Sequence, residues 1–152
     1  MKVPLVKQSP DFKKCLNNGR LVKVEIDLRT VAREVDLAHS DLSEGEASIE
    51  RGSNKWATVQ AYYAMFHAAK ALVHQKGYRE KSHQCLAIAL RELYVRAGKL
   101  DEQMLMEIED ARALREEANC RGSFTEAAAN HSIHVAKQFV EITVKLISES
   151  QQ

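Results

Sequence analysis

Apolar residues recur every three to four positions along most of this chain. The pattern covers five segments between residues 27 and 150, and the connections between the segments are short. This period places the apolar side chains on one face of an α-helix. Long amphipathic helices with short connections pack as antiparallel neighbours. The pattern therefore predicts an all-α fold, an up-and-down antiparallel bundle of four to five helices.

Capping residues define where these helices begin and end. Asp27 is a suitable N-cap for the first helix, and Gly77 and Gly98 stop the second and third. Ser123 and Glu126 have the capping-box spacing, which predicts the start of the fifth helix. The first helix is expected to run from residue 27 into the stretch EGEASIERG. The other four are expected at residues 55–76, 82–98, 101–119 and 123–148. The expected stripe of the first comprises Leu28, Val31, Val35, Ala38 and Leu42, and that of the third comprises Leu86, Leu90, Leu93 and Ala97.

The first 26 residues follow a different pattern. Ser9 and Pro10 begin a short predicted helix, with proline at its first position, and Gly19 follows its end. The next residues, LVKVEID, alternate between apolar and polar, which fits a short extended arm or a lead-in to the bundle. We therefore divide the chain into an N-terminal appendage, residues 1–26, and a helical bundle, residues 27–150.

Composition supports this fold class. The 152 residues include only 2 Pro and 6 Gly, too few for the many turns of an all-β protein. The net charge of +1 implies no overall attraction to nucleic acid, so binding of that kind needs a local basic patch. The sequence has no secretory leader and no apolar run long enough to span a membrane, which predicts a cytoplasmic protein without membrane partners. The three cysteines, odd in number and far apart, fit a reducing compartment better than a disulfide framework or a zinc site.

Arg115 is the most informative polar residue. It falls near the centre of the apolar stripe of the fourth helix, so its guanidinium is expected to face the bundle or a partner. There it needs a carboxylate, a carbonyl or a ligand phosphate. The alternative is a structural role, either in an ion pair or with the charged end reaching the rim.

Two further groups of residues are candidates. The basic loop 74–83, which contains Arg79, Lys81 and His83, leads into a helix N-terminus and could hold a phosphate, although a solvated turn has the same composition. Trp56, Tyr63 and His67 share one stripe of the second helix and fit a groove wall, a dimer surface or the edge of the core. His131 and His134 lack a carboxylate at ligand spacing, and no cofactor motif is present, so neither a metal nor a cofactor is expected.

Two stretches resemble the HEPN family of small helical bundles: NKWATVQAYYAMFHAAKALVHQKGYREKSHQ and LREEANCRGSFTEAAANHSIHVAKQFVEI. With helix order and lengths, the resemblance covers about residues 28 to 148. It implies a bundle that is usually dimeric and often paired with a small nucleotidyltransferase in a toxin–antitoxin system. Some members of the family are metal-independent endoribonucleases that use an Arg followed, after four to six residues, by a His.

The resemblance assigns the family arginine to Arg115, but the histidine is missing. At the three permitted spacings this chain has Cys120, Arg121 and Gly122. A thiol is a poorer proton acceptor than histidine at neutral pH unless its surroundings lower its pKa. The chain is therefore most similar to HEPN proteins that lack this histidine. Asn119 and Arg121 join Arg115 as candidates for ligand binding.

Three hypotheses follow. The first is a homodimeric binding module that holds a nucleotide, an RNA or a nucleotidyltransferase partner, with ribonuclease activity weak or absent. The second is a metal-independent endoribonuclease in which His83 or Cys120 replaces the missing histidine. For His83 this requires the turn between the second and third helices to lie beside the end of the fourth. The third is a structural dimer without a ligand. A surplus of apolar faces on the second and fifth helices motivates the expected homodimer.

Overall fold

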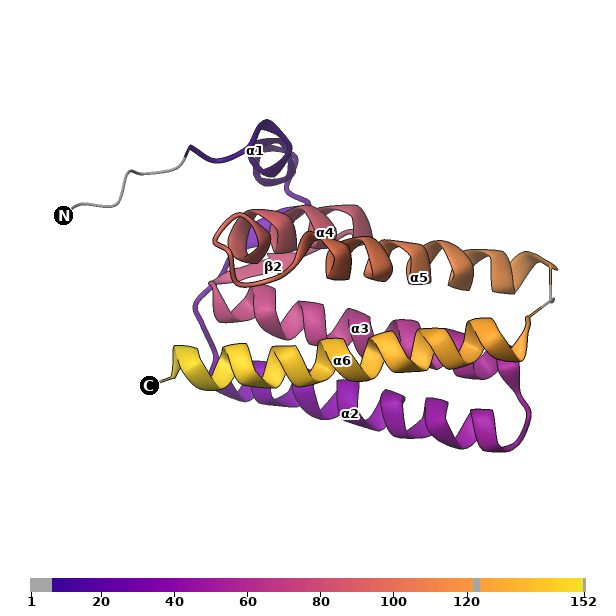
Figure 1. The fold of residues 1–152 in the computed structure, drawn as a ribbon. Helices are drawn as coiled ribbons and strands as arrows, with labels where there is room; N and C mark the ends of the chain where they lie inside the picture. The colour runs from indigo at the N-terminus through magenta and orange to yellow at the C-terminus, as the bar shows by residue number, and fades with distance from the viewer. Residues whose placement is uncertain (1–6, 122–123, 152) are drawn as a thin grey trace.

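The computed structural model describes residues 7–121 and 124–151, and for 118–121 it describes the backbone only. The elements follow one another as α1 (Pro10–Asn17), β1 (Leu21–Lys23), α2 (Leu28–Glu50), α3 (Asn54–Gln75), β2 (Tyr78–Glu80), α4 (His83–Leu90), the π-helical turn η1 (Arg91–Val95), α5 (Glu102–Arg121) and α6 (Glu126–Ser150). Figure 1 shows α2, α3, α5 and α6 running alongside one another, as in an up-and-down bundle. The prediction of an all-α bundle is confirmed.

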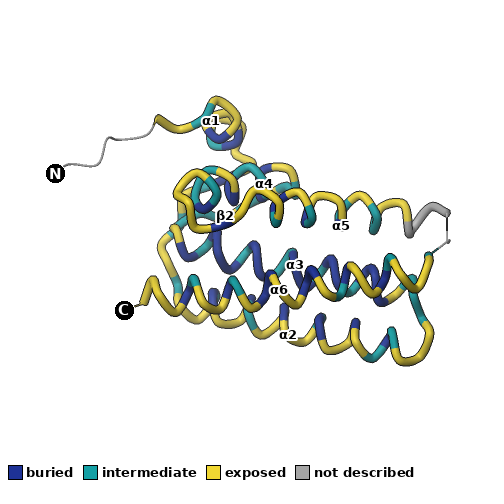
Figure 2. Tube along the Cα trace, viewed as in Figure 1, coloured by how far each residue is buried: buried dark blue, intermediate teal, exposed yellow. Residues whose placement is uncertain are grey.

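Helix α3 occupies the centre of the bundle. It packs against α2, α4, α5 and α6, and Figure 2 shows it as the most continuously buried helix. Small side chains let its neighbours approach closely, among them the fully buried Ala61, Ala64, Ala68 and Ala71. The broad apolar surface of this helix is therefore covered within one chain.

Side-chain caps fix the starts of several helices. The hydroxyl of Ser9, a carboxylate oxygen of Asp27 and the hydroxyl of Ser82 each accept a hydrogen bond from a backbone N–H in the first turn of the helix that follows. The predicted cap at Asp27 and the predicted helix starts at Ser9 and Ser82 are confirmed. For α6 the predicted start at Ser123 is wrong, because the hydroxyl of Thr125 accepts from the backbone N–H of Ala128 and the helix begins at Glu126. Ser123 itself lies outside the described residues.

Two predicted core positions are also wrong. Leu28 is 53% exposed, because it opens α2 at the end of the bundle. Ala97 is exposed because the third predicted helix does not continue to Gly98. Instead α4 ends at Leu90, and η1 widens the helix so that the backbone N–H of Arg96 donates to the carbonyl of Arg91.

The N-terminal segment packs onto the bundle at the α4 end (Figure 1). The Phe12 ring is fully buried and meets the Tyr78 ring edge to face, with 5.4 Å between their centroids. Strand β1 pairs with β2 in antiparallel register, with Leu21 opposite Glu80. The alternating pattern of LVKVEID thus forms a short strand, which the sequence left open.

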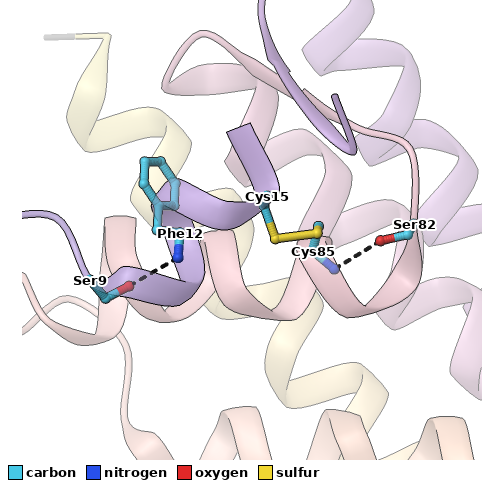
Figure 3. Close-up of a disulfide and its surroundings, with 5 residues drawn as sticks. All are labelled: Ser9, Phe12, Cys15, Ser82 and Cys85. Atoms are coloured by element: carbon cyan, nitrogen blue, oxygen red, sulfur yellow. Dashed lines mark hydrogen bonds between the residues drawn. A yellow bond between two sulfur atoms is a disulfide. The ribbon is translucent and has the colours of Figure 1, made fainter. Parts of the chain in front are cut away.

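A disulfide joins this segment to the bundle. Cys15 on α1 is bonded to Cys85 in the first turn of α4, and their Cα atoms lie 5.9 Å apart (Figure 3). The expectation that the cysteines fit a reduced state better than a disulfide is wrong for this pair. The cysteines are 70 residues apart in the chain, and only the docking of α1 on α4 brings them together.

Candidate functional site

Arg115 faces the central helix, as its position on the apolar stripe of α5 predicts. Its guanidinium carbon lies 5.6 Å from the centre of the Tyr62 ring and 5.4 Å from the centre of the Tyr63 ring. A guanidinium over aromatic rings is stabilised by the cation–π interaction. Its Nε atom is buried and has no hydrogen-bond partner among the described residues. The aromatic rings therefore hold the side chain while part of its hydrogen-bonding capacity stays unused.

His83 stands beside this arginine as the first residue of α4. Its ring stacks on Phe66, with centroids 4.7 Å apart and planes 19° from parallel. Its Nδ1 atom forms a hydrogen bond with the Tyr62 hydroxyl. In the described part of the chain no partner is recorded for its Nε2 atom. Stacking and the Tyr62 contact thus fix the ring and leave one nitrogen available.

The electrostatics of the site are set by burial and by two arginines. Burial lowers the pKa of His83, and the positive charges of Arg112 and Arg115 lower it further. Burial raises the pKa of Tyr62 to about 12, although the same arginines oppose the rise. At neutral pH the phenol is therefore protonated and the imidazole is mostly neutral.

A buried hydroxyl without an acceptor costs free energy, and this requirement assigns the hydrogen bond between the two side chains. The Tyr62 hydroxyl has no other hydrogen-bond acceptor among the described residues, so it donates to Nδ1 of His83. A neutral imidazole that accepts at Nδ1 carries its proton on Nε2. His83 therefore presents an N–H donor, and it does so next to two cations.

A narrow crevice between α3, α4 and α5 passes through the site. Its lining includes Tyr62, Phe66, His83, Glu109 and Arg112, and its volume is about 20 Å³. This is roughly the space of one water molecule, so a base or sugar does not fit inside. A ligand would instead lie across the rim, where Arg112 forms an ion pair with Glu116 at 3.3 Å. The arrangement suits the binding of one anionic group.

The basic loop is divided by the structure. His83 turns toward the arginines of α5, whereas Arg79 lines a separate cavity of about 270 Å³ with Arg33, Glu34 and Lys70. The Lys81 side chain is exposed, and its backbone N–H donates to the carbonyl of Arg20. The structure thus brings His83 to Arg115 and leaves Arg79 elsewhere.

The stripe of the second predicted helix is divided as well. Tyr63 packs on Arg115, whereas Trp56 is 54% exposed. Nδ1 of His67 lies 2.6 Å from a carboxylate oxygen of Glu34 on α2. The side chains of the remaining candidates, Asn119, Cys120 and Arg121, lie outside the described residues.

His67 belongs to a charged network between α2, α3 and β2. Glu34 is contacted by His67 and by the ammonium of Lys70 at 3.7 Å, and Lys70 lies at the same distance from Glu80. Burial raises the pKa of Glu80 and of Asp41, the second acid near His67. Opposite charges compensate one another here, which indicates a structural role.

No metal centre is formed by the residues that the structure describes, since no three His, Cys, Asp or Glu side chains are grouped suitably. His131 pairs instead with Glu107, at 3.0 Å between α6 and α5. Among the described helices, none has both the length and the apolar character needed to cross a membrane.

Three residues of the site were not singled out from the sequence. Arg112 precedes Arg115 by three positions, a spacing that puts both on one helix face, and this signal could have been used. Tyr62 and Phe66 lie on the apolar core stripe of the second predicted helix, together with Val59, Ala69 and Val73, so periodicity predicts a core role for them. Tyr62 is indeed buried, but its hydroxyl reaches His83.

In this helical bundle, Arg115 of α5 is held against aromatic rings of α3. The arrangement matches a known class of protein. The model of the HEPN domain family aligns with residues 33–147, and the chain belongs to that family. Within this class it is similar to a protein of Methanocaldococcus jannaschii named "Putative toxin MJ0605". The two are 29% identical over 116 residues, which cover 76% of this chain and 87% of the relative.

Proposed function

We propose that this HEPN protein binds RNA or a nucleotide through a phosphate group held by Arg115, Arg112 and His83. The observation that carries the proposal is the state of Arg115. Its guanidinium is held against Tyr62 and Tyr63, and its Nε is buried without a partner among the described residues. An unsatisfied buried donor costs free energy, which a phosphate oxygen would recover.

The neighbouring groups support an anionic ligand. Arg112 adds a second guanidinium, and His83 adds an N–H donor in its neutral form. Arginine binds phosphate with two parallel N–H donors, so two arginines and one imidazole match several phosphate oxygens. Aromatic rings beside the site also offer surfaces for base stacking.

The same hydrogen bond favours binding over cleavage. A general base for the ribose 2′-OH needs an unprotonated nitrogen within reach of that hydroxyl. Tyr62 occupies Nδ1 of His83 and leaves the proton on Nε2, so His83 is arranged as a donor. The electrostatic contact of His83 with Arg112 and Arg115 would suit a replacement for the family histidine, but the tautomer opposes it. We therefore propose ribonuclease activity that is weak or absent.

The biological setting of this binding is a further part of the proposal. The relative's name, "Putative toxin MJ0605", supports a role in a toxin–antitoxin system. We propose a homodimer and a nucleotidyltransferase partner in that system, as the family resemblance implies.

RNA binding by single-site variants tests the proposal. Fluorescence anisotropy with a labelled single-stranded RNA is expected to show that Arg115→Ala weakens binding about tenfold or more, the loss typical of charge-assisted hydrogen bonds. Arg29→Ala is the matched control, because the Arg29 side chain is 96% exposed on α2. Equal affinity of wild type and Arg115→Ala, with lowered thermal stability of the variant, would make Arg115 structural and refute the site. Robust cleavage of the RNA by wild type would favour the endoribonuclease instead.

A further inference from the structure

The Cys15–Cys85 disulfide forms part of the wall of a cavity. The cavity has a volume of about 160 Å³ and is lined by both cysteines and by Asp11, Lys14 and Arg20, among others. Each cysteine is only 4% exposed, so the cavity is the route by which a small molecule approaches the sulfur atoms. The disulfide is therefore inaccessible to proteins and accessible to small molecules.

We propose that this disulfide is a thiol-exchange site for small anionic thiols of the glutathione class. The cavity is lined by both cysteines, and two of its three charged lining residues are the cations Lys14 and Arg20. These charges attract the carboxylates of such a thiol and stabilise its thiolate. The proposal does not depend on RNA binding.

The two sulfur atoms differ as leaving groups. Cys85 is the third residue of α4, and its backbone N–H donates to the Ser82 hydroxyl that caps this helix (Figure 3). A thiolate in the first turn of a helix is stabilised by the partial positive charge of the helix N-terminus. Cys15 lies in the second half of α1, away from that end of its helix. Thiol exchange proceeds fastest when the more stable thiolate departs.

The direction of exchange follows from this difference. The incoming thiolate attacks Sγ of Cys15, a new S–S bond forms there, and the bond between Cys15 and Cys85 breaks. Its electron pair leaves on Sγ of Cys85, which becomes a thiolate at the start of α4. A second thiolate attacks the small-molecule sulfur of the mixed disulfide. One oxidised thiol dimer is released, and the electron pair of the broken bond leaves on Sγ of Cys15 as a thiolate.

The attachment of α1 then rests on weaker contacts. Among the described residues these contacts include the packing of Phe12 on Tyr78 and the pairing of β1 with β2. They also include two hydrogen bonds, from the backbone N–H of Ser9 to Glu92 and from Arg96 to the carbonyl of Lys7. Opening the disulfide is therefore expected to increase hydrogen exchange in residues 10–17 more than in α3.

Peptide mapping of the full-length oxidised protein tests the assignment. The protein is treated with millimolar reduced glutathione, free thiols are blocked by alkylation after an acid quench, and tryptic peptides are analysed by mass spectrometry. The expected first product, trapped before the second thiol reacts, carries glutathione on Cys15 and the alkyl label on Cys85. An adduct mainly on Cys85, or a disulfide that remains closed, would overturn the proposal.

Charge variants test the role of the cavity. The measured quantity is the rate with anionic glutathione divided by the rate with cationic cysteamine. Replacing Lys14 and Arg20 together by Gln is expected to lower this ratio about fivefold at low salt, and Asp11→Asn is expected to raise it. Lys13→Gln, a neighbouring lysine of α1 that does not line the cavity, is the matched control. Unchanged ratios in both cavity variants would refute recognition of the anionic thiol.

Discussion

The Tyr62 hydroxyl on α3 donates a hydrogen bond to Nδ1 of His83 at the start of α4. This bond joins the most buried helix to the rim of the site. It fixes the orientation of the imidazole and determines which nitrogen carries the proton. Because Arg112 and Arg115 contribute to the electrostatic environment of His83, the state of this one ring affects the whole site.

His83 is predicted to titrate below the ordinary histidine value of 6.5. Burial is the main cause, and Arg112 and Arg115 add to it. NMR titration of the imidazole resonance measures this pKa directly. Arg115→Ala should move the pKa upward but not fully to 6.5, because burial remains. A wild-type pKa above 6.5 would contradict the described electrostatics.

The lowered pKa also predicts a pH dependence of stability. Below pH 6.5 the unfolded chain binds a proton at His83 more readily than the folded protein does. The contribution of His83 to the free energy of unfolding therefore falls as pH drops from 6.5 to the folded pKa. Thermal unfolding between pH 5 and pH 7.5 measures the change, and His83→Gln should reduce its slope. An identical slope in the variant would assign the effect to other groups.

Tyr62→Phe is predicted to loosen His83 while keeping the aromatic contact with Arg115. The loss of one hydrogen bond is expected to cost about 0.5–1.5 kcal/mol, measured by chemical denaturation. RNA affinity should fall by less than in Arg115→Ala. Tyr63→Phe is the control, since the described residues show no hydrogen bond from the Tyr63 hydroxyl. Equal effects of the two substitutions would argue against the role of the Tyr62–His83 bond.

Several helix starts were predictable because they depend on nearby residues. Ser9, Asp27 and Ser82 each cap a helix through a bond that spans two or three residues. The position of Arg115 was also predictable, since the period of α5 places it on the stripe that faces the bundle.

Contacts between distant segments were not predictable from one sequence. His83 and Arg115 are 32 positions apart, and periodicity says which face a residue occupies but not which helix covers that face. The disulfide between Cys15 and Cys85 was not predicted for the same reason. The η1 turn was missed because the spacing of Leu86, Leu90, Leu93 and Ala97 fits a regular α-helix. In the structure the turn changes the register, so that Tyr94 is buried and Ala97 is exposed.

Reduction of the disulfide is predicted to destabilise the fold. A bond between cysteines 70 residues apart restricts the unfolded chain, which the chain-entropy model values at about 4 kcal/mol. Chemical denaturation of the Cys15→Ala/Cys85→Ala double variant, compared with oxidised wild type, measures the loss. Treatment with a reductant should lower wild-type stability and leave the double variant unchanged. Stability that is insensitive to the reductant in both proteins would contradict this role.

Homodimerisation stays a prediction, although the argument from the apolar surface of α3 is weaker. The apolar circumference of α3 is covered by α2, α4, α5 and α6 of the same chain. Large apolar side chains remain exposed at scattered positions: Ile26, Leu28, Leu37, Trp56, Met106 and Val144. Light scattering at micromolar concentration is expected to show a dimer, and Trp56→Ser should weaken it if this face takes part. A monomer at all concentrations would end the dimer hypothesis.

Glu34 is predicted to stabilise the bundle through its contacts with His67 and Lys70. It is 7% exposed, and its carboxylate lies 2.6 Å from Nδ1 of His67 and 3.7 Å from the ammonium of Lys70. Removing one member of a buried pair leaves the others uncompensated, at a typical cost of about 3–5 kcal/mol. Both partner side chains retain some solvent contact, at 19% and 29% exposure, which reduces the penalty. Glu34→Ala is therefore expected to cost about 2–3 kcal/mol of unfolding free energy, near the value for a charged hydrogen bond.

Glu34→Gln keeps the side chain's shape and its hydrogen-bond acceptor, so it should cost less than Ala. Glu46→Ala, an exposed position on the same helix, provides the baseline in denaturant titrations. If Glu34→Ala costs no more than Glu46→Ala, the network does not stabilise the fold, and its acids and bases would be free for another role.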